Sequence, residues 1–259
     1  MLFRWLRNRR RRRLLADAMP GEWCEVLDRN YQHYRDLPLG DRDRLCDLLR
    51  VFVDEKRWEG CAGLEVTDEM KVTIAAQACL LTLNLDDPHD VYRHADTILL
   101  YPAQYAPVEQ HRDAAGVVHE RPTARLGEAH YMGPVVLSWA SALAGARDED
   151  DGRNVVYHEF AHKLDMADDL TDGTPPLHSR EDYADWVRVM TREFHTLRDR
   201  TATGKATLLD EYGATNVAEF FAVATEFFFE KPKQVQRRHP QLYDVLQRYF
   251  RQDPAARMR

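Results

Sequence analysis

The sequence carries an H-E-x-x-H motif at residues 158–162, a spacing that suits metal-assisted hydrolysis. On a helix, one turn separates His158 from His162, so their imidazole rings project side by side and could bind one Zn²⁺ ion. Glu159 lies about 100° around the same helix, where its carboxylate could take a proton from a water molecule that the metal activates. The motif therefore predicts a zinc-dependent hydrolase with Glu159 as its general base.

The residues around the motif predict the helix that it needs. Val156, Phe160 and Leu164 recur at i, i+4 and i+8, which is the pattern of a buried helix stripe. On a helical wheel this stripe lies nearly opposite the two histidines, which would therefore face a cleft. Asn154 is suited to cap the start of the helix. The alternative, a helix with two incidental surface histidines, is disfavoured by this context.

A catalytic zinc usually has three protein ligands, and the nearest candidates for the third follow the motif directly. In the pattern H-E-x-x-H-x-x-G-x-x-H, Asp165 would replace the glycine and Asp168 would occupy the third-ligand position. That pattern requires a sharp turn at the glycine, and an aspartate such as Asp165 adopts such a conformation less readily. We therefore expect Asp165 and Asp168 to lie in an exposed helix end and the loop that follows it.

A glutamate on a later helix is the other candidate for the third ligand. Residues 216–229 are unusually apolar, so a carboxylate among them calls for a partner. Glu219 and Glu226 are seven residues apart and share one helix face. Glu219 could instead complete a capping box with Asn216, and Glu226 could lie on a solvated or hydrogen-bonded face. Spacing alone leaves both glutamates open.

Length and composition are those of a soluble globular protein. The chain has 259 residues, of which 44% are hydrophobic and 31% charged, so it can bury a sizeable core. The longest apolar stretch, around residues 75–83, is too short to span a bilayer, and no apolar region of a secretory signal follows the basic N-terminus. The cysteines, which lack a C-x-x-C pair, are expected to be reduced, mostly buried thiols of a cytosolic protein. They are Cys24, Cys46, Cys61 and Cys79.

Charge is distributed unevenly along the chain. The net charge is −7, yet Arg4, Arg7 and residues 9–13 are all arginines. Such a run could contact anionic lipid or nucleic acid. A solvated, frayed terminus is the simpler interpretation, and the acidic remainder of the chain argues against a dedicated nucleic-acid-binding protein.

Hydrophobic periodicity predicts helices towards both ends of the chain and short strands in the middle. Helices are expected over residues 41–59, 68–83, 154–165, 183–197, 216–230 and 241–250, strands over 97–101, 116–119 and 134–139, and a polar loop over 168–176. This order predicts an α+β fold, mostly helical, with a small mixed sheet beside the zinc-binding helix, as in zincins. We expect a single domain over residues 1–259, with a mobile arginine-rich segment (1–20), a helical portion (21–90) and a catalytic core (91–259).

Several further segments, in a fixed order, carry a resemblance to a known family. They are GLEVTDEM at 63–70, AAQAC at 75–79, GPVVLSW at 133–139, HEFAHKLD at 158–165 and PPL at 175–177. Together they resemble the Mlc titration factor A family from about Trp58 to Phe250. The family consists of bacterial cytosolic zinc metallopeptidases, and their catalytic portion is similar to that of anthrax lethal factor.

The resemblance implies a set of site residues. The family's metal ligands are the two histidines of the motif and the glutamate of an Ala-Glu-x-Phe-Ala-Val segment, which here correspond to His158, His162 and Glu219. A tyrosine seven residues before that glutamate belongs to the family's active site, and Tyr212 stands there. The resemblance thus implies one zinc ion per chain, with Glu159 and Tyr212 as catalytic residues.

Two functions follow from the resemblance. One is that of a cytoplasmic peptidase that cleaves a peptide substrate. An aminopeptidase-like activity is one form that this could take. The other is binding of the glucose repressor Mlc, a transcriptional repressor, which would release the genes of sugar uptake. If repressor binding were the whole function, the zinc would have only a structural role. The presence of Glu159 argues against this, because a structural metal site needs no general base. The strand at 134–139 is expected to offer an edge to which an extended peptide adds as a further strand.

Overall fold

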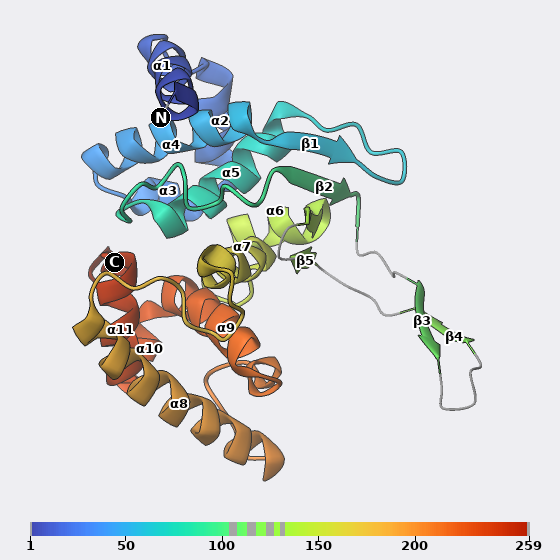
Figure 1. Ribbon diagram of the computed structural model, residues 1–259, viewed down its shortest axis with the longest axis vertical. Coiled ribbons are helices and arrows are strands. Elements are labelled where there is room, and N and C mark those ends of the chain that lie inside the picture. The colour runs from blue at the N-terminus through green and yellow to red at the C-terminus, as the bar shows by residue number, and fades with distance from the viewer. Residues whose placement is uncertain (1, 104–107, 113–117, 123–126, 130–132, 258–259) are drawn as a thin grey trace.

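The computed structural model describes residues 2–103, 108–112, 118–122, 127–129 and 133–257, and most of these are helical (Figure 1). The helices are α1 (Leu2–Ala16), α2 (Gly21–Asn30), α3 (Gln32–Asp36), α4 (Leu39–Glu55), α5 (Asp68–Thr82), α6 (Trp139–Arg147), α7 (Val155–Asp165), η1 (Met166–Asp168), α8 (Arg180–Ala202), η2 (Glu211–Ala214), α9 (Val217–Glu230), α10 (Pro232–Arg238), α11 (Pro240–Phe250) and α12 (Pro254–Arg257). The strands are β1 (Arg57–Gly60), β2 (Thr97–Tyr101), β3 (Val108–Arg112), β4 (Val118–Pro122), β5 (Gly127–Ala129) and β6 (Val135–Ser138). The predicted α+β class is confirmed.

The main sheet is small and mixed, as expected. Its strand order is β1-β2-β6-β5, in which β1, β2 and β6 run parallel and β5 runs antiparallel to β6. Strands β3 and β4 pair with each other in a separate antiparallel ribbon. The strand predicted at 116–119 corresponds in part to β4, and residues 116–117 lie outside the described residues.

Two expectations, one about the end of a helix and one about the edge of a strand, are wrong. The helix predicted over 41–59 ends at Glu55, because Lys56 adopts an extended conformation and Arg57 starts β1 by donating from its backbone N–H to the carbonyl of Asp96 at 2.9 Å. The predicted strand 134–139 does not offer a free edge either. As β6 it pairs with β2 on one side and with β5 on the other.

Helix α7 lies in the middle of the helical layers, in contact with α5 on one side and α9 on the other (Figure 1). Its stripe of Val156, Phe160 and Leu164 is fully buried, as the periodicity predicts. The ring of Phe160 packs edge-on against Tyr92 at 4.8 Å between centroids. This apolar anchorage fixes the rotation of α7 and leaves its opposite face for polar side chains.

Asparagine caps start the two helices that matter most for the site. The side chain of Asn154 accepts from the Tyr157 N–H at 3.0 Å at the start of α7. The side chain of Asn216 accepts from the Glu219 N–H at 2.9 Å at the start of α9. Each cap satisfies a backbone donor that the first helical turn leaves unpaired, so both helix starts are well defined.

The arginine-rich terminus differs from the frayed segment expected from the sequence, because residues 2–16 form helix α1, which packs against α4. Within α1, Arg11 is buried and pairs with Glu55 at 2.7 Å and Asp90 at 2.8 Å. All four cysteines are free thiols as expected, although only Cys79 is buried. Within the described part of the chain, every helix is too short or too polar to cross a membrane.

Candidate metal centre

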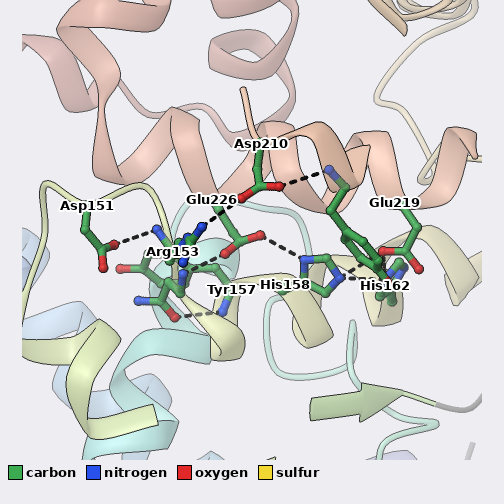
Figure 2. Close-up of polar contacts among 10 residues, drawn as sticks. Asp151, Arg153, Tyr157, His158, His162, Asp210, Glu219 and Glu226 are labelled. Atoms are coloured by element: carbon green, nitrogen blue, oxygen red, sulfur yellow. Dashed lines mark hydrogen bonds and ion pairs between the residues drawn. The ribbon is translucent and has the colours of Figure 1, made fainter. Parts of the chain in front are cut away.

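Helices α7 and α9 bring His158, His162 and Glu219 to one point (Figure 2). The Nε2 atom of His158 lies 3.0 Å from Oε2 of Glu219, and Nε2 of His162 lies 3.3 Å from the same oxygen. The two Nε2 atoms are 3.3 Å apart. The three potential ligand atoms therefore form a compact triangle. The two histidines are one turn apart on α7, and Glu219 comes from α9, 57 to 61 positions later in the sequence.

The size of this triangle fits a tetrahedral zinc site. Zinc binds histidine nitrogen and carboxylate oxygen at about 2.0–2.2 Å, so neighbouring ligand atoms of a tetrahedral site are about 3.3 Å apart. The separations of 3.0 and 3.3 Å agree with that value. Two imidazoles and one carboxylate also form a donor set that catalytic zinc uses, with one position left for water.

The electrostatics of the triangle favour a positive charge. Burial opposes ionisation of the Glu219 carboxyl, but hydrogen bonds with His158 and His162 outweigh it, so its pKa lies below the ordinary value. Burial also disfavours the charged imidazolium of His158, yet the hydrogen bonds to Glu219 and Glu226 outweigh burial and raise its pKa well above the ordinary value. The carboxylates thus stabilise a cation here, and a divalent metal would supply one.

Glu226 contacts the ring nitrogen of His158 that faces away from Glu219 (Figure 2). Sequence spacing alone does not identify this contact. Its Oε1 lies 2.8 Å from Nδ1 of His158, and its Oε2 accepts from the Asn154 N–H at 2.6 Å. The signal in the sequence is a carboxylate that shares a helix face with Glu219 inside an apolar segment. Carboxylates hydrogen-bonded to a ligating histidine fix the orientation and tautomer of its ring.

A second buried carboxyl, Glu230, ties the start of α7 to the end of α9. Asn154 donates from Nδ2 to Oε1 of Glu230 and to the carbonyl of Gly145, both at 3.1 Å. Glu230 is fully buried, and its burial raises its pKa well above the ordinary value. Through this carboxyl and its own cap, Asn154 joins the start of α7 to the end of α9.

Glu159 and Tyr212 come from α7 and η2, the elements that hold or adjoin His158. Glu159 is 4% exposed on α7, next to His158, and its negative charge acts on Lys163, which donates to the carbonyl of Gly133 at 3.0 Å. Tyr212 comes from η2, is 54% exposed, and its ring centroid is 5.8 Å from that of His158. The structure therefore gathers every residue predicted for the site within one region of α7, η2 and α9.

The two aspartates after the motif lie outside the triangle. Asp168 is exposed, as expected, but Asp165 is fully buried, so the expectation of an exposed helix end is wrong there. The reason is the loop after α7: Oδ2 of Asp165 accepts from the Gly173 N–H at 3.0 Å and anchors the returning chain. Burial raises the pKa of Asp165 to about 6.

Comparison with known proteins places the chain among metallopeptidases. The family model of the glucose-regulated metallo-peptidase M90 matches residues 5–251. An uncharacterised protein of Synechocystis sp. is 38% identical over 252 residues, covering 96% of this chain and 90% of that protein. Mlc titration factor A of Edwardsiella ictaluri is 35% identical over 85% of this chain and 84% of its own, and that of Yersinia pestis is 31% identical over 98% and 91%.

Proposed function

The chain belongs to the glucose-regulated metallopeptidase M90 family, and from this membership we propose that it is a zinc-dependent peptidase. In this proposal His158, His162 and Glu219 hold the metal. The observation that carries it is the triangle of their ligand atoms, all within 4.8 Å of one another at the junction of α7 and α9. A zinc ion there would act as a Lewis acid and lower the pKa of a water molecule towards about 7.

The chain's own residues have distinct parts in this chemistry. Glu159 accepts a proton from the attacking water and passes it to the leaving amine. Tyr212, whose ring lies beside His158, donates its hydroxyl proton in a hydrogen bond to the developing oxyanion. Its exposure lets the hydroxyl reach a substrate that arrives from solvent. Glu226 orients His158 and does not itself touch the substrate.

The substrate in this proposal is an extended peptide. The sequence suggests that it adds to the strand now identified as β6, but β5 already covers that side. Strand β5 ends the order of the main sheet and contacts α7, so the outer side of β5 is the better place for an added strand. Backbone hydrogen bonds to β5 would hold an extended substrate beside α7.

The test compares metal content and peptide hydrolysis in the wild type and in Glu159→Gln. We expect about one zinc per chain in both proteins. Hydrolysis of a peptide library should fall by roughly 10²-fold or more in the variant, because the amide cannot accept a proton. His162→Ala should lose both the zinc and the activity. Zinc retained in His162→Ala would overturn the ligand assignment, and unchanged hydrolysis in Glu159→Gln would remove Glu159 as the base.

Repressor binding is the second candidate function, and the names of the relatives support it. Proteins 31–35% identical to this chain are named Mlc titration factor A. The same Glu159→Gln protein separates this function from hydrolysis, because binding needs a surface and no proton transfer. Binding of an Mlc-like repressor, measured by calorimetry, should be equal in wild type and variant. If the wild type cleaves no peptide with or without the repressor, repressor binding becomes the better assignment.

A further inference from the structure

Helix α1 has an inner face that uses arginines to attach it to the body of the protein. The ion pairs are Arg7–Asp90, Arg10–Asp54, Arg11–Glu55 and Arg11–Asp90, at 2.7 to 3.0 Å. Their partners lie at the end of α4 and in the segment before β2. These pairs fix which side of α1 faces the protein and therefore which side faces solvent.

The outer face of α1 carries three further arginines together with Trp5, and Leu6 lies at its border beside the inner face. Trp5 is 51% exposed and Leu6 48% exposed. Arg9, Arg12 and Arg13 are exposed as well, and on a helical wheel they flank Trp5. The guanidinium of Arg9 lies 5.5 Å from the centroid of the Trp5 ring. Arg12 and Arg13 form no ion pair with any residue that the structure describes.

We propose that this outer face of α1 docks the protein onto an anionic lipid surface, with Arg9, Arg12 and Arg13 on the headgroup phosphates and Trp5 and Leu6 in the interface. Exposed arginines on a surface helix are attracted to anionic headgroups, and an exposed aromatic ring beside them can add apolar contact at the interface. A nucleic-acid backbone would also pair with the arginines, but binding to its phosphates gives no role to the exposed leucine beside them. The acidic remainder of the chain also favours docking through α1 alone, because an anionic surface repels it.

The docking face and the metal centre are separate in the fold. Helix α1 packs on α4, α4 on α5, and α5 on α7, so two helical layers lie between α1 and the metal helix (Figure 1). A protein held by α1 would keep the metal centre on its far side, open to the aqueous phase. This proposal is therefore independent of whether the protein is a peptidase.

The test is sedimentation of the full chain with vesicles of phosphatidylglycerol and phosphatidylcholine in equal parts, against vesicles of phosphatidylcholine alone. Each arginine near an anionic surface contributes about 1 kcal/mol, so Arg9→Gln/Arg12→Gln/Arg13→Gln should weaken binding roughly 100-fold. Trp5→Ala should weaken it about tenfold. Glutamine keeps helix propensity, and circular dichroism checks the fold of each variant. The matched controls are Arg198→Gln/Arg237→Gln/Arg238→Gln and Leu39→Ala, which alter exposed residues outside α1 and should bind like the wild type.

The expected pattern is binding to anionic vesicles only, weakened by raised salt and by the α1 variants but not by the controls. Equal binding to both kinds of vesicle, or none to either, overturns the proposal. So does an equal loss in the control triple variant, since that would indicate a nonspecific effect of charge. If duplex DNA competes with the vesicles at lower concentration and depends on the same arginines, the face serves nucleic acid instead. Should the triple variant misfold, Trp5→Ala and the salt dependence of the wild type decide the matter.

Discussion

Nδ1 of His158 lies 2.8 Å from Oε1 of Glu226, while Nε2 of the same ring faces Glu219 at 3.0 Å. With a metal ion on the Nε2 side, the imidazole would be neutral and would carry its proton on Nδ1, where the Glu226 carboxylate can accept it. The other oxygen of Glu226 accepts from the Asn154 N–H. One side chain of α9 thus sets both the start of α7 and the orientation of its first histidine.

We predict that Glu226→Gln weakens zinc binding by about 10- to 100-fold without removing a ligand. The amide keeps a single acceptor, so it can no longer serve both Nδ1 of His158 and the Asn154 N–H. Competition with a chromophoric chelator measures the affinity. Asp168→Asn, which alters an exposed carboxylate next to the site, is the control and should match the wild type. Wild-type affinity in Glu226→Gln would show that the contact has no part in metal binding.

The two asparagine caps provide a second prediction, because Asn154 is fully buried and has further partners, whereas Asn216 is exposed. Asn216→Ala loses a cap and should lower the free energy of unfolding by about 1 kcal/mol. Asn154→Ala loses a cap and also leaves Glu230 and the Gly145 carbonyl without their amide donor, so we expect a loss of about 3 kcal/mol. Urea unfolding of the metal-free proteins compares them. Equal losses would mean that the bridge from Asn154 to Glu230 adds nothing to stability.

Periodicity predicts α7 well because its stripe of Val156, Phe160 and Leu164 is a local pattern, and the cap at Asn154 is local too. The same reasoning leaves Glu219 and Glu226 equivalent, since seven residues on a helix return to the same face. What separates them is position along α9: Glu219 meets the Nε2 atoms, and Glu226 meets Nδ1. That depends on how α9 crosses α7, which only the resemblance to a family anticipates.

Two features could not be predicted from local patterns: the burial of Asp165, and the pairing of β5 with the edge of β6. The partner of Asp165 is the backbone of Gly173, supplied by a loop without periodicity. The partner of β6 is β5, a strand of three residues that is too short to give an alternating pattern. Arg11 likewise is buried only because Glu55 and Asp90, far apart in sequence, converge on it. The partners of Asp165 and β6 are close in sequence but carry no periodic signal, whereas the partners of Arg11 are far from it in sequence.

Tyr212 gives a third prediction, which separates chemistry from metal binding. Tyr212→Phe keeps the ring that lies beside His158 and removes the hydroxyl. If that hydroxyl stabilises the oxyanion, kcat should fall by about 10- to 100-fold while KM and zinc content stay unchanged. Tyr183→Phe, at a partly exposed tyrosine of α8, is the control for a generic loss of a hydroxyl. An unchanged kcat in Tyr212→Phe would exclude Tyr212 from the chemistry.

Gly173 lies in the loop after α7 and contacts the start of α9. This contact holds the first turn of α9, which carries Glu219, close to the histidines of α7. Its N–H donates to Asp165 at 3.0 Å, and its carbonyl accepts from Nε1 of Trp186 at 3.1 Å. Its φ is +75°, and a Cβ there would lie 2.4 Å from the carbonyl oxygen of Val217. Because that atom is backbone, any side chain must displace the first turn of α9.

The final prediction compares Gly173→Ala with Gly204→Ala. Gly204 also has a positive φ, +64°, but a Cβ there meets no atom within 4 Å. Gly204→Ala should therefore lower the free energy of unfolding by about 1 kcal/mol, the conformational strain alone. Gly173→Ala adds a clash with backbone, so we expect a loss of about 3 kcal/mol or more. Because the displaced turn carries Glu219, zinc affinity should fall in Gly173→Ala and stay unchanged in Gly204→Ala. Urea unfolding and chelator competition measure the two effects, and equal behaviour of both variants would mean that the contact between Gly173 and Val217 does not position the glutamate.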